Sequence, residues 1–312
     1  MASLCDVVPP ILTLVRSLHN NEDVMTTISS MTMDNFIVRP MKRSELYLVF
    51  DWAAAEGWNP GTYDAAECFY QADPCGFFVG ELNNELVASI SAVAYSKDFS
   101  VLGFYIVKPQ FRGRGFGMKM WRAAMAYLGT ERNISLDGEI AQQKNYQKSG
   151  FQITYRHIRY EAVGGGVVPD GIVELKTVPF EKLVAYEQDF FPAERKQFLQ
   201  LWIKQPNSAA LGVVREGYIV GYGVIRKSHT GFRIGPLNAD DEQIAEQLLL
   251  ALLAFGTEAP VYLDMPDANP EAIKLAQRYG MKAVSETVRM YNKEIPHLPI
   301  NRVFSVTSLE VG

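Results

Sequence analysis

The order of predicted strands and helices occurs twice along this 312-residue chain, and this repeat constrains the fold more than any other feature. The first copy reads strand, helix, hairpin, strand, helix, strand, helix and strand between residues 36 and 161, and the stretch from 172 to 291 repeats this order. Matching landmarks are Ile37 with Ile172, Val87 with Val220 and Asp137 with Asp264, at offsets of 135, 133 and 127 residues. A near-constant offset indicates a duplicated unit, so we predict two similar α/β domains, each an α+β arrangement on a mixed sheet. Two unrelated domains with a similar element order are the alternative.

The stretch AVGGGVVPDG, residues 162–171, has the glycine and proline content of a linker between the two copies. We therefore expect an N-terminal extension at 1–34, a first domain at 35–162 and a second at 163–312.

Composition narrows the class of protein. The formal net charge is −5 and the pI is near 5.5, so no general basic surface invites nucleic acid. The longest apolar candidate, VVPPILTLVRSL, is interrupted by Pro9, Pro10 and Arg16, so we expect no membrane span. The three cysteines and four histidines have no zinc-ligand spacing, so we expect no metal and a reducing cytoplasm.

The stretch VKPQFRGRGFGMKMW, residues 107–121, leads from a predicted strand through three glycines into a predicted helix. Such a junction presents unpaired N–H groups and the positive end of the helix dipole, which favours a phosphate or pyrophosphate. It has no Gly-Lys-Ser/Thr sequence and does not follow the first strand, which excludes a nucleotide P-loop and a Rossmann unit. A glycine-rich surface turn is the alternative.

The corresponding stretch of the second copy, RIGPLNADDEQIAEQ, places Asn238, Asp240, Asp241 and Glu242 at the predicted helix start. Acidic side chains there cap the helix and repel a pyrophosphate. We therefore predict one anion site per chain, in the first copy.

The first copy resembles the GNAT superfamily of acetyl-CoA-dependent N-acyltransferases across residues 36–161. The match is that family's Arg/Gln-x-x-Gly-x-Gly/Ala signature, here Arg112, Gly115 and Gly117, after a strand ending in YIVKP. The resemblance implies that Ile106 and Val107 pair with the pantetheine arm of coenzyme A through their peptide groups. It also implies a pyrophosphate site, which consists of Arg112 and the backbone of Gly113, Arg114, Gly115, Phe116, Gly117 and Met118.

The resemblance also points to catalytic residues. Tyr146 in NYQKSGF stands where many members carry the tyrosine that protonates the departing thiolate. The strand before the glycine loop has no carboxylate, unlike many members. Asp137 and Glu139 lie two apart on the neighbouring predicted strand, hence on one face, and either can act as the base. Each is equally well read as part of a solvated strand end.

We expect acceptor contacts from Trp58, Asn59 and Tyr63 in EGWNPGTY, since aromatic residues beside a Pro-Gly turn can line a cleft. Ordinary packing is the alternative for the tryptophan. The second copy resembles a GNAT fold without coenzyme binding, and we expect it to wall the acceptor site.

Together these features predict a tandem GNAT enzyme that moves an acetyl group from acetyl-CoA to a primary amine of a small molecule by direct attack in a ternary complex. Transfer of a longer acyl chain is one alternative. A non-catalytic acyl-CoA-binding module is another.

Overall fold

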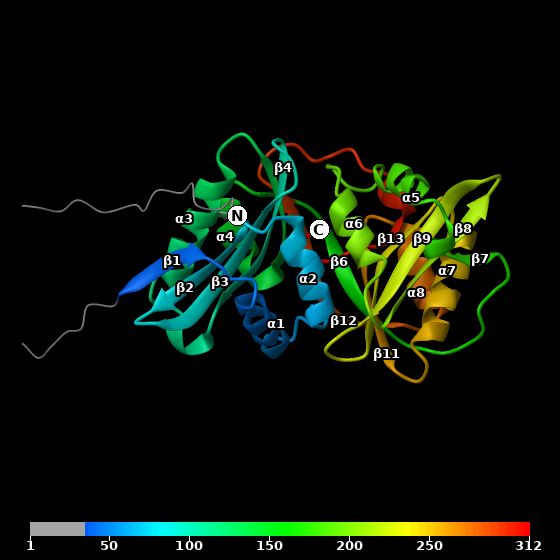
Figure 1. Ribbon diagram of the computed structural model, residues 1–312, viewed down its shortest axis with the longest axis horizontal. Coiled ribbons are helices and arrows are strands. Elements are labelled where there is room, and N and C mark those ends of the chain that lie inside the picture. The colour runs from blue at the N-terminus through cyan, green and yellow to red at the C-terminus, as the bar shows by residue number, and fades with distance from the viewer. Residues whose placement is uncertain (1–34) are drawn as a thin grey trace, which may run out of the picture.

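One mixed sheet of 13 strands runs through both halves of the chain. The structure is a computed structural model and describes residues 35–312, so the predicted extension at 1–34 lies outside the described residues. Figure 1 shows two lobes side by side, with the first half of the chain in blue to green and the second in green to red. No helix among the described residues is long and apolar enough to cross a membrane.

The first half follows the predicted order with one additional helix, α2. Its elements are β1 (Phe36–Pro40), α1 (Glu45–Ala55), α2 (Tyr63–Ala72), β2 (Phe77–Leu82), β3 (Glu85–Ala94), β4 (Phe99–Val107), α3 (Phe116–Leu128), β5 (Asn133–Glu139), α4 (Gln143–Lys148) and β6 (Gln152–Val163). The predicted hairpin turn is confirmed, because Asn83 and Asn84 have φ of 49° and 68° between paired strands β2 and β3.

The second half repeats the order and ends with a short additional strand. Its elements are β7 (Ile172–Glu174), α5 (Phe180–Glu187), α6 (Lys196–Trp202), β8 (Ser208–Arg215), β9 (Tyr218–Lys227), β10 (Phe232–Ala239), α7 (Glu242–Phe255), β11 (Pro260–Pro266), α8 (Pro270–Arg278), β12 (Lys282–Tyr291) and β13 (Val303–Ser305). Four short 3₁₀ turns connect these elements: Pro109–Phe111, Ile140–Gln142, Leu175–Thr177 and Ile300–Arg302.

The two halves exchange their last long strands. The sheet order is β1-β2-β3-β4-β5-β12-β6-β11-β10-β9-β8-β7, so β12 of the second half pairs with β5 of the first, and β6 of the first pairs with β11 of the second. The two exchanged strands also pair with each other along most of their length. Each half therefore completes the sheet of the other.

A pair of equivalent ion pairs fastens the exchanged strands. Arg289 of β12 binds Asp137 of β5, with Nε to Oδ1 at 2.9 Å and Nη2 to Oδ2 at 2.6 Å. Arg159 of β6 binds Asp264 of β11 in the same way, at 2.7 and 3.0 Å. All four side chains are at most 8% exposed. The repeat seen in the sequence thus extends to the buried charges that join its two copies.

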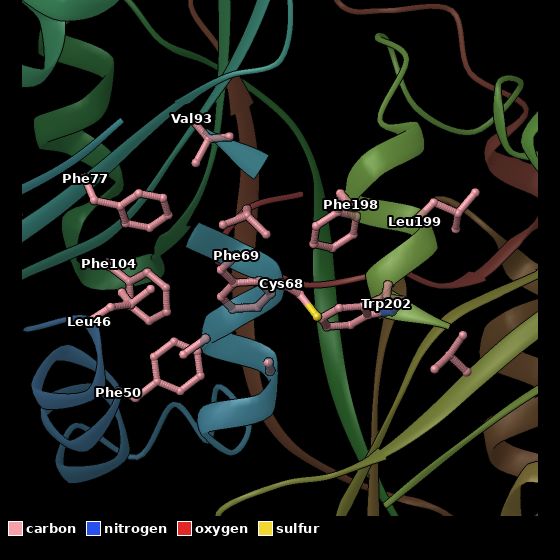
Figure 2. Close-up of a cluster of buried hydrophobic side chains, with 14 of the residues drawn as sticks. Leu46, Phe50, Cys68, Phe69, Phe77, Val93, Phe104, Phe198, Leu199 and Trp202 are labelled. Atoms are coloured by element: carbon pink, nitrogen blue, oxygen red, sulfur yellow. The ribbon is translucent and has the colours of Figure 1, made fainter. Parts of the chain in front are cut away.

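A shared apolar cluster closes the interface between the halves (Figure 2). Phe69 of α2 stacks on Trp202 of α6 with ring centroids 5.7 Å apart, and Phe198 stacks on Trp202 at 5.0 Å. Burial of such aromatic surface stabilises the contact between the lobes.

Candidate functional site

A bulge in β4 opens the sheet beside the predicted site. Phe104 has φ of 43°, and the pairing with β3 shifts so that Ile90 faces two residues of β4. Strands β4 and β5 are parallel neighbours only over Phe99–Leu102 and Asn133–Leu136. No described strand pairs with the other edge of β4 beyond that point, so its peptide groups near Val107 lie on a free edge.

Of the two residues expected to pair with pantetheine, Val107 and Ile106, only Val107 faces this edge. Lys108 N–H donates to the Val87 carbonyl on β3 at 2.9 Å, so that pair is a hydrogen-bonded one. Because hydrogen-bonded and open pairs alternate along an antiparallel ladder, Val107 turns its peptide groups away from β3 while Ile106 turns its own toward Ser89. The Val107 carbonyl already accepts a hydrogen bond from Arg112 Nε at 2.8 Å. The Val107 N–H points to the free edge.

The glycine loop leaves the start of α3 bare. Gly113 and Gly115 have φ of 76° and 80°, a region that favours glycine, and nothing in residues 35–312 beyond their chain neighbours lies within 4 Å of where a Cβ would stand on either. Gly115 is the N-cap residue, and no side chain caps the first turn of α3. The exposed N–H groups of this turn, with the helix dipole behind them, can hold an anion.

The remaining predicted loop residues have defined positions. Arg112 is ion-paired with Glu56 as well as bonded to Val107, so it braces the loop against α1. Phe116 is buried and stacks on Phe36 with centroids 4.3 Å apart, while Met118 is half exposed. A Cβ on Gly117 would stand 2.8 Å from the hydroxyl oxygen of Tyr105, so this glycine allows α3 to pack closely on β4.

The guanidinium of Arg114 lies over the ring of Phe116, 4.8 Å from its centroid. This position keeps the cation beside the bare first turn of α3.

The second half closes the equivalent junction in two ways. The stretch before the predicted helix is strand β10 as far as Ala239, and its Ile234 and Leu237 contribute to the core. Asp241 then caps α7, accepting from Ile244 N–H at 2.8 Å, as the acidic sequence predicts. Strand β13 pairs with β10 at Leu237 and Asn238, beyond the point where β10 and β11 separate.

Strand β13 therefore fills the gap that stays open beside β4. Ser305 Oγ accepts from Asp264 N–H at 3.1 Å and donates to the Ile234 carbonyl at 2.9 Å, which links it to both neighbouring strands.

Tyr146 lies on the face of β5 that packs against α3. A Cβ on Gly138 would stand 2.6 Å from its ring, and the Trp121 ring is 5.8 Å away between centroids. Its hydroxyl makes no hydrogen bond with any residue that the structure describes. Burial, with smaller contributions from Tyr105 and Glu139, raises the pKa of Tyr146 above its ordinary value, so the phenol keeps its proton at neutral pH.

Glu139 and Asp137 share the opposite face of β5 but differ in what surrounds them. Glu139 is exposed and accepts from Trp58 Nε1 at 2.8 Å. Asp137 is fully buried and binds Arg289 and His157, the latter at 2.8 Å. Burial acts to raise the pKa of Asp137, but the interactions with Arg289 and His157 outweigh burial and lower it.

Asp137 forms the same kind of buried ion pair as Asp264 in the other half, and this arrangement favours a structural role for Asp137 over the expected catalytic one. Glu139 is then the remaining candidate base.

The three expected acceptor residues do not form one group. Trp58 is half-buried and donates a hydrogen bond to Glu139 from its indole nitrogen. Its backbone carbonyl accepts a hydrogen bond from Arg159 Nη1 at 2.5 Å. Asn59 joins the halves, since its Oδ1 accepts from Ser228 Oγ at 2.7 Å. Tyr63 is half exposed and donates to Asp51 at 2.9 Å, away from both.

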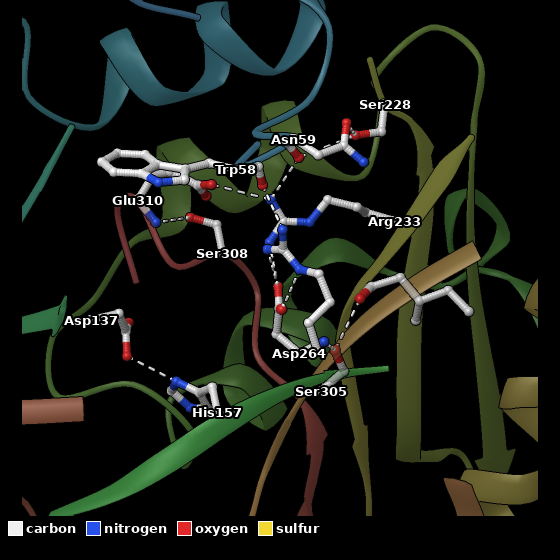
Figure 3. A network of polar contacts seen from close by, with 12 residues as sticks. Trp58, Asn59, Asp137, His157, Ser228, Arg233, Asp264, Ser305, Ser308 and Glu310 are labelled. Atoms are coloured by element: carbon white, nitrogen blue, oxygen red, sulfur yellow. Dashed lines mark hydrogen bonds and ion pairs between the residues drawn. The ribbon is translucent and has the colours of Figure 1, made fainter. Parts of the chain in front are cut away.

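Sequence reasoning missed a buried polar network between the halves (Figure 3). Its members come from both halves and from residues near 310: His157, Arg159, Arg233, Asp264, Ser305, Ser308 and Glu310. Arg226 is buried beside them. The segments that supply these residues are far apart in sequence and have no motif spacing. Arginines on otherwise apolar strands, as in VIRK and FRIG, were the one available signal.

Comparison with known families gives each half a match. A model described as acetyltransferase (GNAT) family matches residues 43–151, and one described as acetyltransferase (GNAT) domain matches residues 183–305. The holothin acyltransferase of Pseudoalteromonas sp. is 29% identical over 279 residues, which are 88% of this chain and 94% of that protein. The uncharacterized N-acetyltransferase YitH of Bacillus subtilis is 22% identical over 228 residues, 71% and 80% of the two chains.

Solved structures share the fold. A putative acetyltransferase from Pyrococcus horikoshii has a TM-score of 0.76 at 21% identity, covering 94% of this chain and 99% of that one. A tandem GNAT protein from the clavulanic acid biosynthesis pathway has a TM-score of 0.59 at 15% identity, covering 84% and 99%.

Proposed function

The chain belongs to the GNAT superfamily of acyltransferases, and on that premise we propose that it transfers an acetyl group from acetyl-CoA to a primary amine of a small molecule, by direct attack in a ternary complex. Acyl transfer is common to the family. The acetyl donor, the class of acceptor and the roles of individual residues are our proposal.

The contrast between the two strand-to-helix junctions carries the proposal. In the first half, α3 begins at Gly115 without a side-chain cap, and the adjoining edge of β4 is free. In the second half, Asp241 caps α7 and β13 covers the edge of β10. Since a pyrophosphate needs bare N–H groups and a pantetheine arm needs an unpaired strand edge, one donor site per chain is expected.

Residues of the first half would position the donor. The N–H groups of the Gly113–Met118 stretch would bind the pyrophosphate, and the α3 dipole would add a favourable field. The Val107 N–H would bind the pantetheine arm along β4. Arg112, engaged with Glu56 and the Val107 carbonyl, would hold the loop in shape rather than contact phosphate.

Glu139 and Tyr146 would move the protons from opposite faces of β5. Glu139 would accept a proton from the amine, whose nitrogen forms a bond to the thioester carbonyl carbon. As the C–S bond breaks, Tyr146 would donate its proton to the leaving sulfur. The bond from Trp58 would keep the Glu139 carboxylate in place at the mouth of the site.

One comparison favours turnover over a merely binding role. The relative from Pseudoalteromonas is named for acyl transfer to holothin, and its likeness spans both halves of this chain. This supports a catalytic protein that uses both domains over a coenzyme-binding module.

Calorimetry with acetyl-CoA tests the donor site. We expect one site per chain in the wild type and no measurable binding in Gly115→Val, whose side chain would occupy the pyrophosphate position. Gly217→Val is the matched control, because Gly217 has the same φ of 80° but lies in the β8–β9 turn. Two sites per chain, or equal binding by Gly115→Val and wild type, would contradict the proposal.

Turnover is tested by thiol release from acetyl-CoA with a panel of amino acids, polyamines and aminoglycosides. Binding of acetyl-CoA without release of thiol for any amine would favour the non-catalytic alternative.

A further inference from the structure

Arg226 is a buried cation without a hydrogen-bond partner. It lies on β9 and is only 1% exposed. None of its three guanidinium nitrogens forms a hydrogen bond with any residue in the described part of the chain. Its guanidinium carbon lies 4.7 Å from the centroid of the Trp202 ring, a cation–π contact. Burial, and then Arg233, lower the pKa of Arg226 to about 9, the direction expected for a cation short of partners.

The charges around Arg226 do not balance. Arg159 and Arg233 both bind Asp264, and Arg233 Nη1 also lies 3.2 Å from Glu310 Oε1. With Arg226, this gives three buried guanidiniums and two carboxylates. Glu310 Oε2 is itself buried without a partner. Buried charges are normally paired, so one anion is missing from this network.

Hydrogen bonds and close packing connect this network to Glu139, the proposed base. Trp58 binds Glu139 through its indole N–H and Arg159 through its carbonyl. The Glu310 carbonyl oxygen lies against Gly103, where a Cβ would stand 1.9 Å away, next to the bulge in β4. An acceptor that has its amine near Glu139 can therefore extend toward this network.

We propose that Arg226 binds a carboxylate of the acceptor, so that the acceptors are amino carboxylates rather than polyamines or aminoglycosides. The inference rests on the proposed acyl transfer and names its substrate class. The acceptor carboxylate supplies the missing negative charge, and the planar guanidinium offers it two parallel hydrogen bonds.

The loop of residues 57–62 covers Arg226 in this structure. A Cβ on Gly61 would stand 2.4 Å from Arg226 Nη1, so the loop packs directly on the guanidinium at this glycine. Asn59 fastens the loop to the second half through Ser228 and Thr230. The acceptor carboxylate reaches Arg226 when this loop moves aside, and this movement requires the hydrogen bonds from Asn59 to Ser228 and Thr230 to break.

The test compares acceptors that differ only in the carboxylate: an amino acid, its carboxamide and its decarboxylated amine, each assayed by thiol release. For the wild type we expect kcat/KM to be about 10- to 100-fold higher for the amino acid, the usual value of a hydrogen-bonded charged pair. Arg226→Met should remove this preference, mainly by raising KM, and leave acetyl-CoA affinity unchanged. The control Arg215→Met, at an exposed arginine of neighbouring β8, should keep it.

Stability separates the proposal from a structural role for Arg226. If Arg226 has no partner, Arg226→Met should leave the Tm unchanged or raise it, because an uncompensated buried charge is removed. If the guanidinium instead pairs with the free Glu310 oxygen in solution, the same variant should lower the Tm and leave the ratio of amino acid to carboxamide unchanged. That result overturns the proposal.

A binding measurement tests the proposal if no amine is turned over. Calorimetry of the same amines should show binding of the amino acid that Arg226→Met weakens. Turnover of amines without a preference for carboxylates overturns the assignment of Arg226 alone. Absence of turnover, with carboxylate binding that depends on Arg226, overturns the acyl transfer and leaves the anion site standing. Absence of both overturns the two together.

Discussion

Replacing Tyr146 by phenylalanine removes one oxygen atom from the proposed centre and almost nothing else. The ring packs against Gly138 and Trp121, and phenylalanine keeps these contacts. The hydroxyl makes no hydrogen bond within residues 35–312, so its loss leaves no described donor or acceptor unsatisfied. We expect the free energy of unfolding to change by less than about 0.5 kcal/mol.

The effect on rate should be much larger. A thiolate gains charge only as the C–S bond breaks, so a proton donor stabilises the transition state more than the bound substrates. Loss of a general acid lowers kcat by about 10²-fold, which corresponds to about 2.7 kcal/mol in the barrier. Acetyl-CoA affinity should remain near that of the wild type, which places the change in kcat.

The assay is steady-state thiol release with the best acceptor, combined with calorimetric binding of acetyl-CoA and thermal unfolding. Tyr127→Phe is the matched control: the Tyr127 hydroxyl donates to the Asp73 carboxylate at 2.8 and 3.0 Å, so that variant should lose stability and keep its rate. A well-folded Tyr146→Phe with wild-type kcat would remove Tyr146 from the mechanism.

Five further substitutions test the site and the fold. Glu139→Gln should lower kcat without affecting stability, whereas Asp137→Asn should lower the free energy of unfolding by weakening the Arg289 pair; the reverse result would exchange the two roles. Asp241→Ala should cost about 1 kcal/mol in chemical denaturation, and an unchanged midpoint would contradict its capping role. Ser305→Ala should cost about 1 to 3 kcal/mol and leave one acetyl-CoA site per chain in calorimetry; a second site would mean that β13 alone blocks the second half. Burial acts to raise the pKa of Asp264, but Arg159 and Arg233 lower it overall. This carboxylate therefore stabilises the fold above about pH 4, and the stabilisation disappears as the pH falls further. An Asp264→Asn variant should show a flatter acid-denaturation curve.

The element order and the contrast between the two junctions could be predicted from the sequence, because both depend on local patterns. Apolar periodicity locates α7 and β11, and the run of acidic residues before α7 predicts the cap that Asp241 makes. Strand β10 was missed because Gly235 and Pro236 interrupt its apolar pattern. Helix α2 was missed because the preceding Pro-Gly pair reads as a turn and its alternating polar residues weaken the periodicity.

The strand exchange and the buried arginines had no local signal. A sequence pattern indicates that β6 and β12 are strands but not which sheet each joins, since the pairing depends on residues about 100 or more positions away. The landmark Asp137 was correctly aligned with Asp264, yet its partner Arg289 becomes visible only when β12 is placed beside β5. The proposed roles of Glu139, Tyr146 and the glycine loop stay predictions.

The exchange of β6 and β12 also sets the order in which a newly made chain can fold. While the ribosome is still adding residues, the first half lacks the strand that flanks β5, because that strand is residues 282–291. The edge of β5 and both edges of β6 stay without their partners until β11 and β12 have been made. Unpaired strand edges favour association with other chains, so slow synthesis exposes this protein to aggregation for longer than it would a chain with two self-contained domains. Overexpression with chaperones that bind unpaired strands should therefore improve its soluble yield.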